Sequence, residues 1–396
     1  MEIKIGLIGC GTVGRGLLEI LERKRAYLKD AFHFEARLVA ISDKLKGSLL
    51  IPDGIDIAKV LVLLEAGRRI DEYPDKPEPA QPVDPLDMIE KTNADVIAEL
   101  TYTNIETAEP ATGYIKKCFR SGHHVVTSNK GPAALHYKEL RALAETNGLL
   151  FRIEGTVMSG TPVFSLVESG LAGTEIREVK GILNGTTNFI LSKMEQDGME
   201  YADALRLAQK LGYAEADPTA DVEGLDAVNK LVILARLAFG AWIDPDAVSN
   251  RPGSTSGRPG APGITAVTAE DVAALAAEGR ILRLIATTRL AEDGAIEASV
   301  VPTAVPAGSP FGRCDGVLNR VEVDATPVGS VAFEGPGAGG PAAAAAVLSD
   351  LVSIARGVGS TWAGSPAATV RSGIPVRPVA GECIAAPSGA CYPVGD

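Results

Sequence analysis

The sequence predicts an α/β protein in which an open parallel sheet, with helices on both faces, is interrupted by an inserted α+β domain. Three observations predict this fold. An apolar stretch near the N-terminus leads into a glycine-rich turn and then a helical pattern. Short apolar strands and helices alternate up to about residue 150, and strands mix with long helices from 151 to about 320. The length of 396 residues is that of two or three domains.

Residues 1–150 are predicted to form the first domain. Strand-like stretches alternate with helical patterns, with strands at 3–8, 38–42, 94–100 and 124–127 and helices at 17–29, 105–120 and 133–146. Such alternation is typical of a parallel sheet. Residues 321–357, which contain a helical stretch at 347–355, are expected to return and complete this domain.

Residues 151–320 are predicted to form the inserted substrate domain. It mixes both kinds of element, with strands at 178–183, 283–290 and 296–301 and helices at 204–211 and 225–239. Residues 358–396 are dominated by Gly, Pro and Ala and are predicted to be a tail.

Composition argues against several classes of protein. The formal net charge is −12, from 38 basic and 50 acidic residues, which argues against a nucleic-acid partner held on a broad basic face. Charges interrupt the apolar residues at the N-terminus, and Arg236 interrupts the longest apolar run, 231–243. We therefore expect neither a signal peptide nor a membrane span, and predict a cytoplasmic protein whose partner is a small molecule.

Cysteine and histidine are too sparse for several kinds of site. The cysteines show no zinc-ligand spacing and are expected to be free thiols: Cys10, Cys118, Cys314, Cys383 and Cys391. Cys383 and Cys391 in the tail could pair, but free thiols are favoured in a reducing cytosol. The four histidines all lie before residue 140, which leaves little material for a histidine-based triad or metal site. Catalysis is therefore expected to use lysine and carboxylates.

A glycine pattern, Gly9-Cys10-Gly11-Thr12-Val13-Gly14, follows a predicted strand and opens a predicted helix. In this context Gly9 permits a tight turn, Gly11 lets the backbone approach a pyrophosphate, and Gly14 lets helix and strand pack closely. The helix N-terminus supplies free N–H groups for the phosphate. The pattern predicts a Rossmann-like dinucleotide-binding domain, with a turn whose glycines serve only packing as the alternative.

The second strand ends at Asp43, which could accept a hydrogen bond from the adenosine 2′-hydroxyl of NAD. Lys44 and Lys46 follow it and could instead neutralise the 2′-phosphate of NADP. The sequence does not decide between NAD and NADP, although Asp43 slightly favours NAD.

Two lysines are candidates for the chemistry. Asp226 and Lys230 lie one helical turn apart on the helix predicted at 225–239, just before its apolar stretch. An ordinary surface ion pair would have the same spacing. Lys130 follows the strand at 124–127, at the edge where open parallel sheets bind ligands, although a solvated loop lysine also fits.

These residues and their neighbours resemble the homoserine dehydrogenase family over residues 1 to about 357. The motifs that carry the resemblance occur in the family's order, at 9–14, 99–104, 125–132, 181–188, 212–230 and 335–339. The stretch 212–230 is highly specific, whereas the glycine turn alone is not.

The resemblance implies NAD(P)-dependent interconversion of L-homoserine and L-aspartate 4-semialdehyde, in threonine, methionine and isoleucine biosynthesis. It implies that Lys230 is the acid/base residue and that Lys130 lies between nicotinamide and substrate. The implied substrate contacts are Glu215, Asp226, Thr186 and Tyr213. The implied cofactor contacts beyond the three glycines are Thr12, Val13, Thr101, Thr103, Lys130, Gly212 and Gly335. A homodimer formed through the sheet of residues 151–320 is also implied.

The implied chemistry needs a proton carrier, because hydride leaves the alcohol carbon while its hydroxyl loses a proton. A free lysine has a pKa of about 10.4 and is a poor base at neutral pH. A second ammonium group would lower that pKa and Asp226 would raise it, and the sequence leaves both effects open.

The resemblance also implies a monovalent cation, Na⁺, near Glu154 and the loop at 155–161. Val157, Ser159 and Thr161 would supply further oxygen ligands, which suit a hard cation. Met158 and Ser159 stand where small residues are common in the family. The alternative is a structural turn with Glu154 in a surface ion pair.

Many family members carry a C-terminal domain that senses threonine. Residues 358–396 are too few to form one, so we expect no threonine inhibition through such a domain. Two other functions stay in consideration, a related oxidoreductase acting on another small amino acid and a cofactor-binding regulator without catalysis. The presence of both Lys130 and Lys230 argues against the regulator.

Overall fold

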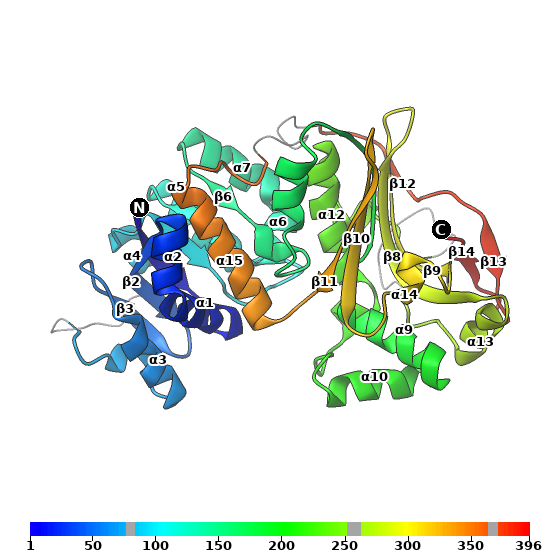
Figure 1. Cartoon of the computed structure of the whole chain (residues 1–396), viewed down its shortest axis with the longest axis horizontal. Helices are drawn as coiled ribbons and strands as arrows, with labels where there is room; N and C mark the ends of the chain where they lie inside the picture. Colours follow the sequence, from blue (N-terminus) through cyan, green and yellow to red (C-terminus); the bar gives the residue numbers. More distant parts are fainter. Residues whose placement is uncertain (77–83, 252–262, 363–370) are drawn as a thin grey trace. The chain divides into compact units, whose positions relative to one another are not determined.

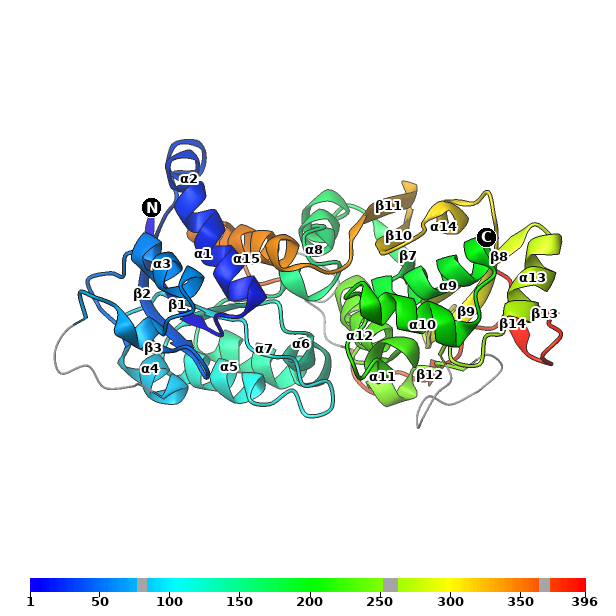
Figure 2. The same cartoon turned by 90° about the horizontal axis from the view of Figure 1, so that it is seen from below.

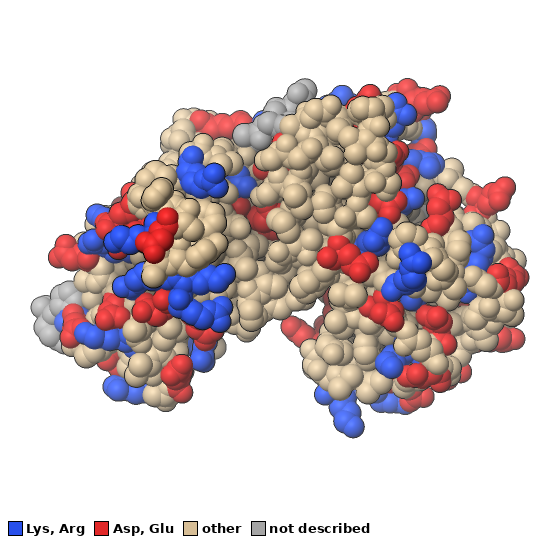
Figure 3. Space-filling model, in the orientation of Figure 1, with Lys and Arg blue, Asp and Glu red and all other residues tan. Residues whose placement is uncertain are grey.

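The computed structural model describes residues 1–76, 84–251, 263–362 and 371–396 (Figure 1). The chain divides into two compact units. The first unit comprises Met1–Pro162 and Ala338–Thr361, and the second comprises Val163–Gly337 and Trp362–Asp396. Acidic and basic side chains are interspersed on the face drawn in Figure 3. Within the described part, no helix is long and apolar enough to cross a membrane.

The first unit is built on a six-stranded sheet. Its strands, in spatial order, are β3 (Gly47–Leu50), β2 (Glu35–Asp43), β1 (Glu2–Ile8), β4 (Val96–Glu99), β5 (His124–Thr127) and β6 (Phe151–Arg152). Neighbouring strands are parallel except β2 and β3, which form an antiparallel pair. The predicted parallel sheet is therefore confirmed except at its β3 edge, where the chain turns back directly after Asp43.

Helices lie on both faces of this sheet (Figure 2). α1 and α15 pack against each other on one face, and α4, α5 and α7 lie on the other. The helices are α1 (Thr12–Arg23), α2 (Arg25–Phe32), α3 (Ile57–Glu65), α4 (Pro85–Lys91), α5 (Ala111–Arg120), α6 (Lys130–Leu135), α7 (Tyr137–Thr146) and α15 (Gly340–Ala355), with 3-10 turns η1 (Ile70–Glu72) and η2 (Glu154–Thr156). A continuous apolar core fills the space between α1, α15 and the sheet.

Three predicted helices differ from the observed ones in where they begin or divide. The helix expected at 105–120 begins at Ala111, since the Asn104 side chain accepts hydrogen bonds from two following backbone N–H groups and forms a turn instead. The helix expected at 133–146 divides at His136, and its first part begins at Lys130 because Asn129 caps it. The helix expected at 17–29 likewise divides, into α1 and α2.

The second unit is built on another six-stranded sheet. Its order is β11 (Gly329–Pro336), β10 (Leu318–Thr326), β7 (Glu175–Ile182), β8 (Arg280–Leu290), β9 (Ile296–Pro306) and β12 (Val376–Arg377), and only β9 and β12 are parallel. The remaining elements are α8 (Val163–Ser165), η3 (Leu166–Gly170), α9 (Gly185–Asp197), α10 (Tyr201–Lys210), α11 (Thr219–Val222), α12 (Leu225–Phe239), η4 (Pro245–Ala247), α13 (Ala269–Ala277) and α14 (Pro310–Arg313). α12 packs against β7 and β8 and has the predicted bounds.

The chain returns to the first unit at Ala338 rather than at residue 321, because β10 and β11 extend the second sheet. In β10, buried Val321, Val323 and Ala325 alternate with more exposed residues. This period of two is the sequence signal of a strand with one buried face.

The predicted tail at 358–396, of which residues 363–370 lie outside the described part, is divided between the units. Residues 358–361 belong to the first unit, and the strands from Val376 onward lie in the second. β12 pairs with β9, and β13 (Cys383–Ala385) forms a hairpin with β14 (Cys391–Pro393). The expectation of free thiols is wrong for Cys383 and Cys391, because the hairpin brings them together as a disulfide. It holds for Cys10, Cys118 and Cys314, which are free and buried.

Asp271, a buried residue on α13, anchors this hairpin. Its carboxylate accepts hydrogen bonds from the Ser388 backbone N–H at 3.0 Å, the Ser388 hydroxyl at 2.7 Å and the Tyr392 hydroxyl at 2.8 Å. Burial alone would raise the pKa of Asp271, but these hydrogen bonds lower it below its usual value. Because an unfolded aspartate has a pKa of about 3.9, the stabilisation is present above that pH and is lost as the pH falls through the lower native pKa.

We expect Asp271→Asn to lower the free energy of unfolding of the second unit by about 1–3 kcal/mol at pH 7, because the charged acceptor is lost. The difference from the parent should shrink as the pH falls below about 4. Urea unfolding at both pH values measures this. Asp197→Asn, in an exposed ion pair with Lys193, is the control and should change stability by less than about 0.5 kcal/mol. An equal loss at both pH values would show that the charge of Asp271 is not involved.

Candidate active site

The glycine turn lies between β1 and α1 at the carboxyl edge of the first sheet. Gly9 has a φ of +90°, and a Cβ on it would lie 2.5 Å from the carbonyl oxygen of Leu100, directly after β4. A Cβ on Gly14 would overlap the Gly9 carbonyl oxygen, whereas nothing lies within 4 Å of one on Gly11. The turn is therefore closed against β4 and α1 but open at Gly11. There α1 presents its N-terminus, with no acidic residue in its first turn.

This opening lies where the strand order of the first sheet reverses, between β1 and β4. Open α/β sheets bind their ligands in the crevice at such a reversal. Two of the predicted cofactor contacts, Thr12 and Val13, lie in the first turn of α1 beside this opening.

Asp43 and Lys46 hold the glycine turn from the end of β2. Asp43 accepts hydrogen bonds from the backbone N–H groups of Cys10 at 2.8 Å, Leu45 at 2.9 Å and Lys46 at 3.0 Å. Burial alone would raise the pKa of Asp43, but these donors and the Lys46 charge lower it. The Lys46 ammonium donates to the Cys10 carbonyl, and Lys44 is exposed. Asp43 and both lysines thus lie near the turn, and neither NAD nor NADP is excluded.

The loops after β4 and β5 meet at the same edge. Asn129 caps α6, whose first residue is Lys130, and its side-chain amide donates to the carbonyls of Thr101 at 3.4 Å and Tyr102 at 3.3 Å. Thr103 follows in the same loop. Asn129 was not among the predicted site residues, although an Asn before a helix is a recognisable cap signal.

Asp226 and Lys230 form a buried ion pair on α12. The Lys230 ammonium lies 2.8 Å from the Asp226 carboxylate and donates to the Leu183 carbonyl at 2.6 Å, and the two side chains are only 6% and 7% exposed. This burial excludes an ordinary surface ion pair. Asn184 donates to Asp226 at 3.0 Å and to Asp221 at 2.7 Å, and so orients the pair from the start of α9.

Sequence reasoning did not select Asn184 or Asp221 as site residues. Their signal is the polar stretch that begins at Gly212 and the asparagine that caps α9 by accepting the Thr187 N–H. Neither signal shows which carboxylates the asparagine reaches.

The other predicted substrate residues lie near the start of α9 and in the loop after α10. Thr186 donates to the Tyr213 carbonyl at 2.6 Å, and the Tyr213 ring packs on Phe189 with 4.9 Å between centroids. Gly212, with a φ of +78°, begins this loop. Glu215 is exposed, and its side chain makes no hydrogen bond or ion pair with a described residue. Gly335 lies in β11, opposite Asn319 of β10.

Family models match both parts of the chain. The model described as homoserine dehydrogenase, NAD binding domain, matches residues 9–154, and the model described as homoserine dehydrogenase matches residues 162–352. An NAD(+)-dependent homoserine dehydrogenase of Pseudomonas canavaninivorans is 38% identical over 355 residues, which are 89% of this chain and 96% of the relative. The chain belongs to the homoserine dehydrogenase family.

Solved structures of homoserine dehydrogenases share the fold. The enzyme from Thiobacillus denitrificans matches with a TM-score of 0.79 and 30% identity, over 96% of this chain and 80% of that one. A hyperthermophilic archaeal homoserine dehydrogenase in complex with NADPH matches with a TM-score of 0.74 and 28% identity, over 90% of this chain and 98% of that one. The predicted family and the α/β fold class with its Rossmann-like domain are confirmed.

Residues 154–161 form the loop in which the family resemblance places a cation. Glu154 is 1% exposed, which excludes a surface ion pair, and its N–H donates to the Asp350 carboxylate at 2.8 Å. Met158 and Ser159 have φ values of +55° and +44°, which are uncommon for residues other than glycine. The described residues contain no group of three or more His, Cys, Asp or Glu side chains suited to a metal. A cation here could be held only by Glu154 with hydroxyl or carbonyl oxygens, which suits a hard monovalent ion better than a transition metal.

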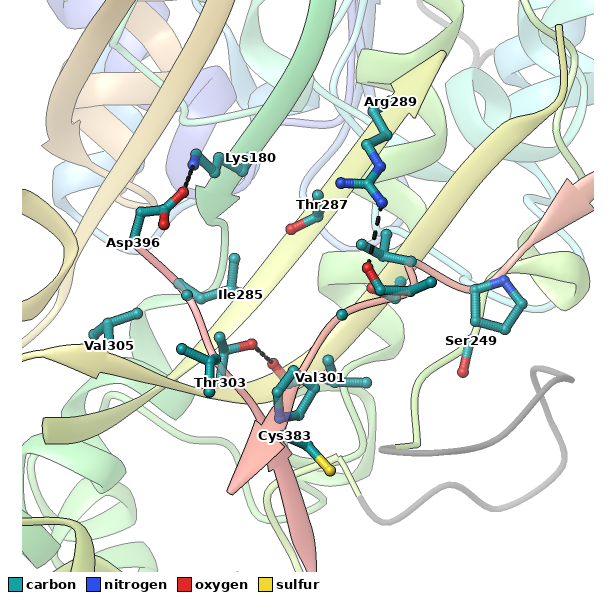
Figure 4. Close-up of a pocket in the computed structure, with 18 of the residues that line it drawn as sticks. Lys180, Ser249, Ile285, Thr287, Arg289, Val301, Thr303, Val305, Cys383 and Asp396 are labelled. Carbon is teal, nitrogen blue, oxygen red and sulfur yellow. Dashed lines mark hydrogen bonds and ion pairs between the residues drawn. The ribbon is translucent and has the colours of Figure 1, made fainter. Parts of the chain in front are cut away.

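A cavity of about 640 Å³ lies in the second unit between the tail and the sheet (Figure 4). It is lined from β8 by Ile285, Thr287 and Arg289. Leu284 points to the opposite face of the same strand, where it lies against Gly224 just before α12. Its charged side chains are already paired, for instance Arg289 with Glu297 at 2.6 Å. Because no predicted site residue lines this cavity, we interpret it as space left where the tail crosses the sheet, and not as the active site.

Replacing Gly14 and Gly11 by alanine separates the packing and binding roles of the glycine turn. Gly14→Ala should destabilise the first unit by more than about 2 kcal/mol, because its methyl group meets the Gly9 carbonyl. Gly11→Ala should fold like the parent but bind NAD⁺ at least about tenfold more weakly, because its methyl group occupies the space that a pyrophosphate would approach. Thermal unfolding and calorimetric titration with NAD⁺ measure both effects. Unchanged NAD⁺ affinity in Gly11→Ala would place the cofactor elsewhere.

Proposed function

We propose that the chain is a homoserine dehydrogenase that interconverts L-homoserine and L-aspartate 4-semialdehyde with a nicotinamide cofactor, a step of threonine, methionine and isoleucine biosynthesis. The observation that carries this proposal is the buried Asp226–Lys230 pair within the family's most specific motif. Burying an ammonium group costs free energy that partners offset only in part, and an apolar residue would fill the same place in α12 without this cost. The buried pair therefore supports a functional role for Lys230.

Lys230 is the proposed proton carrier. The bound nicotinamide exchanges hydride with the alcohol carbon, and one residue must give or take the hydroxyl proton. The Asp226 carboxylate and the Leu183 carbonyl, within 2.8 Å and 2.6 Å of the Lys230 nitrogen, both favour its protonated form. This arrangement suits a proton donor during reduction of the aldehyde, and the reverse role during oxidation of homoserine.

Substrate and cofactor contacts follow the family motifs. Asp226 and Glu215 hold the substrate's polar ends, with Thr186 and Tyr213 beside them. Lys130 lies next to the nicotinamide, and the cofactor backbone is bound at the glycine turn. Residues 1–150 bind the cofactor, the inserted domain binds substrate, and either NAD or NADP serves.

The remaining expectations concern assembly and ions. The enzyme forms a cytoplasmic homodimer through the second sheet, and Na⁺ binds at Glu154, Val157, Ser159 and Thr161. Light scattering of the purified protein tests the dimer, and activity in sodium-free buffer against sodium-containing buffer tests the ion.

Lys230→Ala should lower kcat for homoserine oxidation by about 10²–10⁴-fold, because the proton carrier is removed. The assay follows nicotinamide absorbance with homoserine and either NAD⁺ or NADP⁺. Lys193→Ala, which removes a lysine paired with Asp197 on α9, is the control and should keep parent activity. Turnover of Lys230→Ala within tenfold of the parent would contradict the assignment.

The same assay separates the competing functions. A parent protein that binds NAD⁺ but oxidises another small hydroxy amino acid in place of homoserine would be a related oxidoreductase. Cofactor binding without any turnover would indicate a regulator.

A further inference from the structure

Glu99 is a fully buried carboxyl group at the carboxyl edge of the first sheet. It is the last residue of β4, between β1 and β5, and immediately precedes Leu100, against which the glycine turn closes. A carboxyl group at such a position costs free energy unless its oxygens accept hydrogen bonds. An apolar side chain would fill the same space without that cost.

Two loops supply the hydrogen bonds to Glu99. One oxygen accepts from the backbone N–H of Thr101 at 2.9 Å and from the Thr101 hydroxyl, and the other lies 3.0 Å from the Thr127 hydroxyl at the end of β5. The Asn129 amide also donates to this carboxyl group. Burial raises the pKa of Glu99, and these donors act in the opposite direction.

The groups that donate to Glu99 also set the positions of predicted site residues. Asn129 accepts the Gly131 N–H at 3.2 Å and thereby caps the helix that begins with Lys130. Its amide reaches the carbonyls of Thr101 and Tyr102 in the loop after β4. A shift of Asn129 would therefore move Lys130, and a shift of Thr101 would move the loop that faces the glycine turn.

We propose that Glu99 is a positioning residue. It fixes the loop after β4, which contains Thr101 and is called the Thr101 loop below, relative to Lys130 at the nicotinamide end of the cofactor site. This inference rests on the proposed function, in which Lys130 lies beside the nicotinamide. Glu99 accepts hydrogen bonds but does not touch the substrate. Its removal would leave the Thr101 N–H and hydroxyl without their acceptor. The Thr127 hydroxyl would keep only the Glu99 backbone carbonyl, at 2.8 Å, so the loop after β4 would rearrange.

Steady-state kinetics of Glu99→Gln and Thr127→Val test the proposal. Gln places a donor where the Thr127 hydroxyl needs an acceptor. Val removes the Thr127 hydroxyl with little change in size, and with it the acceptor of the Asn129 backbone N–H at 2.9 Å, so this variant also disturbs Asn129 directly. We expect kcat to fall about 10–100-fold in Glu99→Gln and about tenfold in Thr127→Val, because small displacements of reacting groups are costly. The KM for homoserine should stay within about threefold of the parent in both, because the proposed substrate residues lie in the second unit.

Thr112→Val is the matched control. Thr112 is fully buried in α5 of the same unit, and its hydroxyl donates to the Ala108 carbonyl at 3.0 Å. This variant loses a buried hydrogen bond at the end of the loop after β4, and that bond does not involve Glu99, Thr101 or Asn129. Its melting temperature should therefore fall while its kcat stays within twofold of the parent.

Parent-like kcat in Thr127→Val would overturn the positioning role, and so would an equal loss of kcat in Thr112→Val. If Glu99→Gln does not fold, Thr127→Val and its control decide the question. A parent protein that does not turn over homoserine would instead overturn the proposed function, and the two failures are therefore distinct.

Discussion

The Gly9 backbone lies close against the Leu100 carbonyl at the edge where the cofactor is expected to bind, just beyond the β1–β4 pairing that joins the two halves of the first sheet. This close approach requires a residue without a Cβ and with a φ of +90°, which glycine adopts without strain. By contrast, no other atoms lie close to Gly11, and the N-terminus of α1 faces this free space. Glu99 lies one residue before Leu100, and the Thr101 loop begins one residue after it.

Buried ion pairs occur in both units. Lys230 is held by Asp226 and Leu183, and the buried Arg152 donates to Asp350 at 2.8 Å. Such groups add little net stability, because desolvation offsets most of their attraction. They fix the orientation of the paired side chains instead. For a proton carrier such as Lys230, this fixed orientation matters more than a gain in folding stability.

Local patterns predicted the elements whose structure depends on neighbouring residues. The helix Leu225–Phe239 and the strand His124–Thr127 have the predicted bounds because periodicity and apolar content define them without help from distant segments. β3, β10, β11 and the tail strands were missed or misplaced, because a short strand is stable only through its pairing partner. β10 pairs with β7 as well as with the adjacent β11, and β12 pairs with β9. β7 and β9 are far away along the chain from these partners.

The sequence by itself determined the glycine turn, the restriction of the chemistry to lysine and carboxylates, and the membership suggested by the 212–230 motif. Only the tertiary structure decided that the Asp226–Lys230 pair is buried and that Asn184 orients it. It also decided that Glu99 lies within hydrogen-bond distance of the Thr127 hydroxyl, and that Cys383 and Cys391 form a disulfide. The physical reason is that turn geometry and helical period depend on adjacent residues. Burial and hydrogen-bond partners depend on which distant segments fold against them.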